Sequence, residues 1–229
     1  MIDFGKLKEI NKDTVGWIKV NGTDIEYAVV KTTDNRYYLD HNFENQYNKA
    51  GWIFADYKNR LDGTDKNIVI YGHNRRDGSM FASLKNILKE DWYSNEDNRK
   101  ITFITENEKS VYEVFSVYQI EAEDYYITTD FKNEEFLEYI KTVKQRSIKD
   151  FNVEVSKEDN LLTLSTCGND NDYRVVLHAK KERWKSLFFV TNISSMSQHY
   201  LLALQQSHAK CLLHHLQHLH FHWLNVFLL

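Results

Sequence analysis

The segment Leu161-Leu162-Thr163-Leu164-Ser165-Thr166-Cys167 indicates the fold class of this chain. Its apolar and β-branched residues run without a helical period, and the polar segment Gly168-Asn169-Asp170-Asn171-Asp172 follows at once. An apolar run bounded by turn-forming residues is typical of a buried β-strand that ends in an exposed loop. We therefore predict a strand over 161–166, with Cys167 at its mouth.

Seven other segments among the first 183 residues have the same character, so we expect a mainly β fold. Turn signals such as Asn21-Gly22-Thr23 separate them. Eight strands are enough to close a barrel or to build a sandwich. The other predicted strands cover residues 17–20, 25–30, 52–55, 67–71, 100–105, 111–122 and 173–179.

Helical periodicity is restricted to three segments, at residues 4–10, 79–88 and 134–146. The third is the best formed, because its acidic side chains fall in the first turn and its basic side chains in the last, where the helix dipole favours them. The predicted buried face of this helix consists of Phe136, Leu137, Ile140 and Val143.

The net charge of the 229 residues is -4, which gives no basic field of the kind that nucleic acid requires. Nucleic acid is therefore excluded as a partner. No apolar run reaches the roughly 18 residues needed to span a bilayer, and the start lacks a basic region followed by an apolar one. The chain as given is expected to be soluble, either by nature or because an anchoring segment has been trimmed.

The last 46 residues, 184–229, differ in composition from the rest, because they contain no Asp, Glu, Gly or Arg and hold seven of the ten histidines. We interpret residues 1–183 as the folded domain and 184–229 as a foreign tail, out-of-frame or vector-derived. An alternative is a transition-metal site, since histidines four apart share one helix face. Those histidines are His214, His218 and His222. Cys211, in the same tail, is then an incidental thiol.

Two reactive residue types stand at strand ends. Cys167 ends its strand, and His73 follows the apolar strand 68–71 in a glycine-flanked polar loop. A thiol at a strand mouth can reach a substrate. The alternatives are a small buried hydrophobe for the cysteine and a solvated loop residue for the histidine.

Arg174 opens the strand that returns after the Cys167 loop, so an antiparallel return brings its guanidinium beside the thiol. A cation there favours thiolate over thiol and can donate to an oxyanion. The alternative is an ordinary surface arginine. In another register Arg174 would point away, leaving only Lys180 or Arg183 as poor substitutes.

Cysteine, histidine and arginine together suit acyl transfer, in which a thiolate attacks an amide and an imidazolium protonates the leaving amine. The arginine then supplies a positively charged donor for the tetrahedral oxyanion. The histidines of the domain are too scattered for a zinc site, and no glycine-rich phosphate or dinucleotide motif is present. We therefore expect no metal and no cofactor.

Taken together, these motifs resemble those of a class B sortase, over roughly residues 10–183. The resemblance rests on their joint occurrence in the right order: 37–39 with 51–54, 67–74 with 78–81, and 163–167 followed by Arg174. It implies an eight-stranded sortase β-barrel with an added N-terminal helix and a helix between the sixth and seventh strands. The segment 134–146 falls in that place.

The resemblance implies a cysteine transpeptidase, with Cys167 as nucleophile, His73 as the general acid, and Arg174 holding the substrate and stabilising the oxyanion. Such an enzyme cleaves the sorting motif of a secreted protein after its threonine. It keeps the acyl group as a thioester until an amine of a peptidoglycan precursor takes it. Two alternatives stay open, a cysteine peptidase that uses water and a non-catalytic binding protein of the same fold.

Substrate-binding positions transfer by the same resemblance to Tyr71, Ser165, Asn35 and Leu39. Turn chemistry for Asn35 and core packing for Leu39 are equally good interpretations. Members of the family are held to the outer face of the membrane by an N-terminal apolar anchor. The given sequence lacks one, so we infer a trimmed extracytoplasmic domain.

Overall fold

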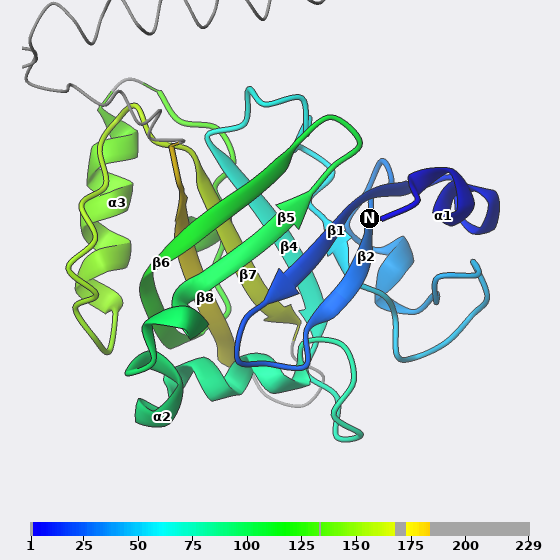
Figure 1. The fold of residues 1–229 in the computed structure, drawn as a ribbon, viewed down its shortest axis with the longest axis horizontal. Coiled ribbons are helices and arrows are strands. Elements are labelled where there is room, and N and C mark those ends of the chain that lie inside the picture. The colour runs from blue at the N-terminus through cyan, green and yellow to red at the C-terminus, as the bar shows by residue number, and fades with distance from the viewer. Residues whose placement is uncertain (1, 133, 168–172, 184–229) are drawn as a thin grey trace, which may run out of the picture. The chain divides into compact units, whose positions relative to one another are not determined.

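The computed structural model describes residues 2–132, 134–167 and 173–183, and the structural statements below concern these residues. The fold is mainly β, as predicted. Eight strands close into a barrel in the order β1-β2-β3-β4-β7-β8-β6-β5 (Figure 1). The strands are β1 (Thr14–Val20), β2 (Glu26–Val30), β3 (Phe54–Ala55), β4 (Asn67–His73), β5 (Lys100–Ile104), β6 (Lys109–Glu121), β7 (Leu161–Cys167) and β8 (Tyr173–Lys181).

All eight strands were predicted, but the end of β4 was placed two residues too early. Gly72 and His73 continue the strand and pair with Thr166 and Cys167 of β7. His73 is therefore not a solvated loop histidine, and its side chain is only 7% exposed. A glycine read as a turn signal is instead required by packing, because a Cβ at Gly72 would lie 2.5 Å from Ile53 Cδ1.

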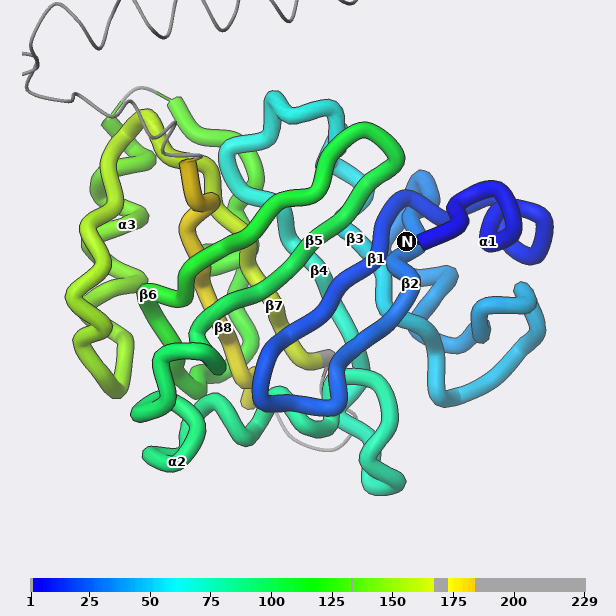
Figure 2. The backbone as a smooth tube through the Cα atoms, in the orientation of Figure 1, coloured from blue at the N-terminus to red at the C-terminus, as the bar shows by residue number. Residues whose placement is uncertain are grey.

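The strand β7 lies between two neighbours of opposite direction. It pairs with β4 in parallel and with β8 antiparallel. Figure 2 shows these three strands side by side along the barrel wall. Residues 161–166 of β7 are all buried, so the strand does not alternate between buried and exposed positions.

Two apolar clusters lie on opposite sides of β4. Ile70 belongs to the main core of the barrel. Val69 and Tyr71 belong to a second cluster, which also contains Val30 and Phe54. Since side chains alternate along a strand, the odd-numbered positions of β4 continue from this second cluster to His73.

Helices lie on the outside of the barrel. The helix α1 (Phe4–Ile10) precedes β1, and α3 (Glu135–Arg146) lies between β6 and β7, both as predicted. Figure 1 shows α3 along the β6 side of the barrel. The remaining helical segments are α2 (Glu90–Tyr93) and the 3₁₀ helices η1 (Tyr37–Leu39), η2 (Ala82–Leu88), η3 (Glu96–Arg99) and η4 (Tyr125–Ile127).

Two helix predictions were wrong in detail. The segment 79–88 forms a 3₁₀ helix over Ala82–Leu88 rather than an α-helix from Ser79. On α3, Leu137 is 40% exposed, whereas Tyr139 is buried at 1%. The buried stripe therefore follows positions 136, 139, 140 and 143, which is the spacing of one helix face, and Leu137 falls off it.

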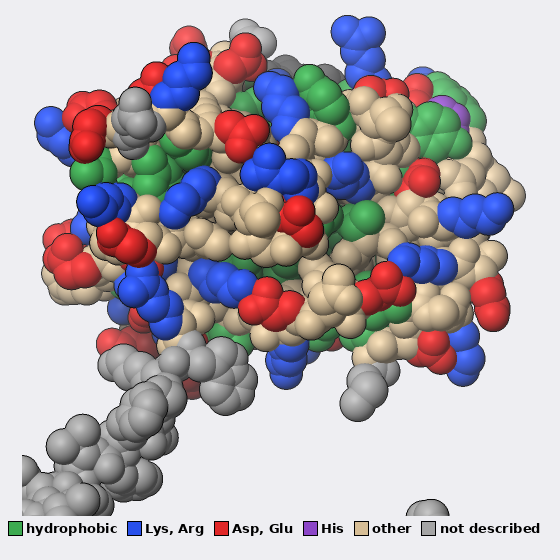
Figure 3. Space-filling model, turned by 90° about the horizontal axis from the view of Figure 1, so that it is seen from above, with side chains coloured by type: hydrophobic (Ala, Val, Ile, Leu, Met, Phe, Trp, Pro, Cys, Tyr) green, Lys and Arg blue, Asp and Glu red, His purple; other side chains and the backbone are tan. Residues whose placement is uncertain are grey.

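The surface seen in Figure 3 carries Lys and Arg side by side with Asp and Glu, with no continuous patch of one sign. None of the helices among the described residues is long and apolar enough to cross a membrane. The predicted tail 184–229, with its histidines and Cys211, lies outside the described residues, as do Gly168 to Asp172.

Candidate active site

The barrel places Cys167 and His73 at paired positions. They are the last residues of β7 and β4, and the parallel register of these two strands pairs them directly. His73 and Cys167 are thus neighbours on adjacent strands, although they are 94 positions apart in sequence.

Arg174 lies on the other side of β7. The antiparallel register of β7 and β8 reaches Ser165 paired with Val176. One step further, the Val175 amide donates to Thr166 Oγ1 over 2.9 Å. Extended by one more residue, this register would set Arg174 opposite Cys167. We call the positions of His73, Cys167 and Arg174 a row across β4, β7 and β8.

The arginine is a half-buried residue at the start of β8. Its Nη1 donates to the Tyr173 carbonyl over 3.2 Å. The two substitute cations lie elsewhere, because Lys180 pairs with Leu161 at the opposite end of β7 and its Nζ donates to the Glu154 carbonyl. Arg183 forms an ion pair with Asp159, which precedes β7.

The imidazole of His73 is held by a backbone group. Its Nε2 lies 2.7 Å from the Leu39 carbonyl oxygen, and since a carbonyl only accepts, Nε2 carries the proton of this bond. Its Nδ1 is buried and has no hydrogen-bond partner among the described residues. The ring is therefore fixed through Nε2, and Nδ1 is the nitrogen that these residues leave without a bond.

A glycine packs against this histidine. Gly51 has φ +60°, and a Cβ there would lie 2.5 Å from the Tyr38 carbonyl, 2.8 Å from the Leu39 carbonyl and 2.9 Å from His73 Cδ2. Only a residue without Cβ permits this close approach of the 48–51 turn to η1 and to the imidazole.

The loop after His73 is fastened within itself. The carboxylate of Asp77 accepts from the Ser79 hydroxyl at 2.6 Å and amide at 3.0 Å, and it forms an ion pair with Arg75 at 3.0 Å. These contacts, above all the Ser79 hydroxyl, hold the pKa of Asp77 well below its ordinary value. The guanidinium of Arg75 is therefore held in an ion pair with Asp77.

The predicted substrate-binding residues Tyr71 and Asn35 meet at one carboxylate. The Tyr71 hydroxyl and the Asn35 amide nitrogen each donate to Asp56 Oδ2 over 2.8 Å. Asp56 was not singled out in the sequence. Its position directly after the short strand Phe54–Ala55 is the signal that could have drawn attention to it.

The other two predicted substrate residues differ in kind. Ser165 is buried at 2%, and its hydroxyl lies 3.4 Å from the Tyr126 hydroxyl of η4, another residue that the sequence reasoning missed. Leu39 packs partly buried against the second apolar cluster, while its carbonyl holds His73. The Leu39 side chain therefore packs against the core, while its backbone carbonyl contacts His73.

Other features of the described residues lie apart from this row. A pocket lined by Leu61, Ile68, Phe103 and Lys181 lies toward the beginning of β4, away from His73. The described residues contain no group of three or more His, Cys, Asp or Glu side chains that could hold a metal ion.

In a comparison with protein families, residues 18–182 match the sortase domain. Among curated proteins, sortase B of Listeria monocytogenes is 43% identical over 180 residues, which cover 76% of this chain and 72% of that protein.

Solved structures agree. The X-ray structure of Clostridium perfringens sortase B has a TM-score of 0.73 and 40% identity, covering 79% of this chain and 100% of that one. A Staphylococcus aureus sortase B-substrate complex has a TM-score of 0.74 and 35% identity, covering 79% of this chain and 85% of that one. A sortase B complexed with triglycine matches with the same TM-score and identity, covering 79% and 86%.

Proposed function

Since this chain belongs to the sortase family, in class B, and is a cysteine transpeptidase of the cell-wall anchoring type, we propose that Cys167, His73 and Arg174 are its catalytic residues. The observation that carries this assignment is the register of the barrel wall. The ends of β4 and β7 pair His73 with Cys167. The β7–β8 register ends at Ser165 and Val176, two residues before Cys167 and two residues after Arg174.

In the first half-reaction, the Cys167 thiolate attacks the carbonyl carbon at the scissile bond of the sorting motif, after its threonine. The tetrahedral intermediate collapses, the carbon–nitrogen bond breaks, and a thioester remains on Cys167. The leaving amine takes a proton from imidazolium His73, through Nδ1, since Nε2 is bonded to the Leu39 carbonyl.

The oxyanion of this intermediate needs a donor. Arg174 serves it, because a guanidinium is always charged and offers several donors in a fixed plane. In the second half-reaction an incoming amine gives a proton to His73 and attacks the thioester carbonyl. A new amide bond forms, and the Cys167 thiolate is released.

Sortase B acts on a substrate peptide and an amine acceptor, as the substrate complex and the triglycine complex of its relatives illustrate. We propose secreted proteins bearing a sorting motif as the natural substrates and an amine of a peptidoglycan precursor as the acceptor. The family works at the cell surface, and we propose the outer face of the membrane as the native location, reached through an N-terminal anchor.

Mass spectrometry of products tests this function. The chain is incubated with peptides that carry candidate sorting motifs, with and without triglycine, in parallel with Cys167→Ala and Arg174→Ala. We expect cleavage after threonine and a ligated product only with the amine present. The Cys167→Ala variant should form neither product, and Arg174→Ala should lose about 100-fold in rate, the scale of one oxyanion donor.

Two results would contradict the proposal. Cleavage that ignores the added amine would identify a peptidase with water as acceptor. Full cleavage by Cys167→Ala would show that another residue is the nucleophile.

A further inference from the structure

The buried carboxylate of Asp56 lies where three segments of the chain meet. It is 3% exposed and follows β3. Its Oδ2 accepts from the Tyr71 hydroxyl and from the Asn35 amide, both at 2.8 Å, and its Oδ1 accepts from the Lys58 backbone amide at 2.9 Å. Hydrogen bonds to a charged acceptor are roughly twice as strong as neutral ones, so this junction is firm.

One connection from Asp56 leads to His73 along β4. Tyr71 is two residues before His73 on the same strand and the same face. Its ring packs against Phe54 with centroids 5.1 Å apart, and its hydroxyl ends on the carboxylate. The Asp56 backbone amide also donates to the Val69 carbonyl over 2.9 Å, which extends the β3–β4 ladder toward the same strand.

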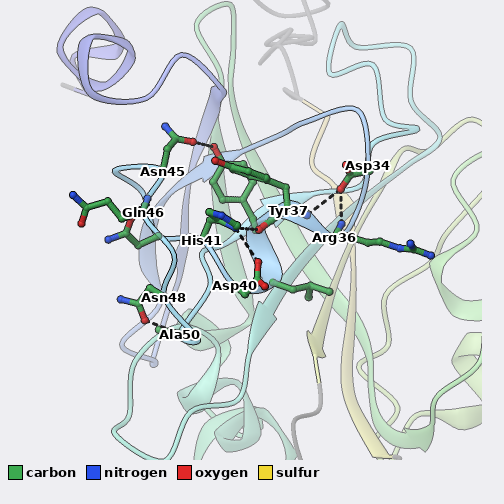
Figure 4. A network of polar contacts seen from close by, with 12 residues as sticks. Asp34, Arg36, Tyr37, Asp40, His41, Asn45, Gln46, Asn48 and Ala50 are labelled. Carbon is green, nitrogen blue, oxygen red and sulfur yellow. Dashed lines mark hydrogen bonds and ion pairs between the residues drawn. The ribbon is translucent and has the colours of Figure 1, made fainter.

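The second connection leads to His73 through η1. Asn35 donates to Asp56 and accepts from the Tyr57 amide over 2.9 Å, so its side chain is fixed at both ends. Figure 4 shows the next step, in which Asp34 accepts from the backbone amides of Arg36 and Tyr37 and starts η1. That helix ends at Leu39, whose carbonyl holds His73 Nε2.

We propose that Asp56 is a positioning residue for His73, because its carboxylate fixes both the strand that carries the imidazole and the loop whose carbonyl selects its tautomer. The proposal rests on the proposed catalytic role of His73. It assigns Tyr71 and Asn35 a task within the protein, the transmission of this restraint, besides any contact with substrate.

Loss of the carboxylate should displace η1 without detaching it. Tyr38, at the centre of η1, has its hydroxyl bonded to Asn11, Asp13 and Asn45, at 2.8, 2.9 and 3.1 Å. The helix therefore keeps its anchor on the side of α1 and β1. What changes is the position of the Leu39 carbonyl relative to the imidazole, and misplacement of a catalytic group by about 1 Å can cost about 100-fold in rate.

The test compares Asp56→Asn with Asp65→Asn in the full chain. Asp65 is a matched control, because it is also buried (5% exposed) and its carboxylate also accepts three hydrogen bonds, from Asn59 Nδ2 and the amides of Arg60 and Leu61. It precedes β4, at the end away from His73. We expect kcat of transpeptidation to fall between about 10- and 100-fold in Asp56→Asn, with KM within about threefold. The kcat of Asp65→Asn should stay within about twofold.

A spectroscopic readout separates positioning from general destabilisation. The ring ¹⁵N shifts of His73, identified by their absence in His73→Gln, report which nitrogen carries the proton in the neutral imidazole. We expect the Nε2–H tautomer in the wild-type protein and in Asp65→Asn. In Asp56→Asn a mixture of both tautomers should appear, since the Leu39 carbonyl no longer selects one.

The proposal is overturned if Asp56→Asn keeps the wild-type kcat, or if its His73 tautomer is unchanged. Should this variant not fold, Tyr71→Phe removes one of the two hydrogen bonds and keeps the ring. A wild-type tautomer in that protein also overturns the proposal, and a mixture supports it. Full activity of Cys167→Ala would instead refute the proposed function, while the tautomer measurement would still decide the role of Asp56.

Discussion

At the residue scale, the candidate site depends on a histidine whose two ring nitrogens have different surroundings. Nε2 is bonded to the Leu39 carbonyl, and Nδ1 is buried without a partner among the described residues. Orphaned buried nitrogens are uncommon and need an explanation. The proposed proton exchange with the substrate amine would give this one a use that an ordinary core histidine does not have.

Gly51 provides the most direct residue-scale prediction. We expect Gly51→Ala to lower kcat/KM by at least about tenfold, because the added Cβ would collide with two carbonyls of η1 and with His73 Cδ2. Steady-state kinetics and a urea melt measure the two effects separately.

Gly63→Ala is the matched control. Gly63 also has positive φ, +90°, but a Cβ there meets nothing within 4 Å. Both variants therefore carry the backbone strain of a left-handed residue, about 1–2 kcal/mol, and only Gly51→Ala disturbs the imidazole. Equal activity of the two variants would contradict the importance of this close approach.

At the element scale, one buried histidine joins three strands of the barrel. His178 of β8 is fully buried. Its Nδ1 lies 2.8 Å from Thr163 Oγ1 on β7, and its Nε2 lies 2.8 Å from the Tyr118 hydroxyl on β6. The Thr163 hydroxyl donates to Asn67 Oδ1 over 2.8 Å, so it accepts from His178, and Tyr118 donates to the other nitrogen. This pattern requires a neutral imidazole.

The neutral state of His178 predicts acid sensitivity. Burial, assisted by the positive charge of Arg146, lowers the pKa of His178 from 6.5 to about 3. Between these values the unfolded chain binds a proton that the folded protein does not, so stability falls as pH falls. The slope is about 1.4 kcal/mol per pH unit, or about 2 kcal/mol between pH 6.5 and pH 5.

Urea unfolding of wild type and His178→Gln at pH 7 and pH 5 measures this contribution. The glutamine can donate and accept but does not titrate in this range, so the variant should lose about 2 kcal/mol less than wild type on acidification. The same loss in both proteins would mean that His178 is not the group responsible.

The stripe on α3 gives a second prediction at this scale. Ile140 is 5% exposed and Leu137 is 40% exposed, although one helix carries both and their side chains have the same volume. We expect Ile140→Ala to cost about 2–5 kcal/mol of unfolding free energy and Leu137→Ala about 0.5 kcal/mol or less. Chemical denaturation of both variants checks this. A larger loss of unfolding free energy in Leu137→Ala than in Ile140→Ala would mean that the buried face of α3 has been assigned wrongly.

How far the sequence predicts these elements depends on what defines each one. The eight strands and α3 were predictable, because turn residues and periodicity are local signals. The last two residues of β4 were missed, since Gly72 is read as a turn and only the packing of Phe81 and Ile53 against it shows its purpose. Leu137 was misplaced because a 3.6-residue period leaves neighbouring positions ambiguous.

The candidate site divides in the same way. Cys167, His73 and Arg174 could be named from residue types at strand ends together with a family resemblance. Asp56 was missed, because its place after β3 marks it only as a residue at a strand end. Its partners, Asn35 and Tyr71, come from 21 residues before it and 15 residues after it. Long-range contacts of this kind exist only once the barrel has formed.

At the scale of the whole molecule, the residues that follow β8 are bonded to the rest of the described domain. After β8, the Glu182 amide donates to the Val111 carbonyl over 2.8 Å, and its carboxylate pairs with Lys100 at 2.5 Å. Arg183 pairs with Asp159 at 3.0 Å. The sortase family match also ends here, at residue 182.

We therefore expect a chain that ends at Arg183 to keep the activity and the unfolding midpoint of the full chain. A chain that ends at Ala179 is the control, because it lacks the part of β8 that pairs with Tyr112, Glu113 and Leu161. Thermal unfolding and transpeptidation assays compare the three proteins. A large loss of stability in the 1–183 chain would show that residues 184–229 belong to the fold.

The central claim is that the row formed by β4, β7 and β8 performs acyl transfer through Cys167. Its most direct test is intact-mass spectrometry of the protein mixed with a sorting-motif peptide in the absence of an amine acceptor, followed by peptide mapping. We predict an adduct of the acyl fragment on Cys167, which disappears when triglycine is added and does not form in His73→Gln above about 1% of the wild-type rate. An adduct on another residue, or peptide turnover without any adduct in rapid-quench samples, would contradict the account.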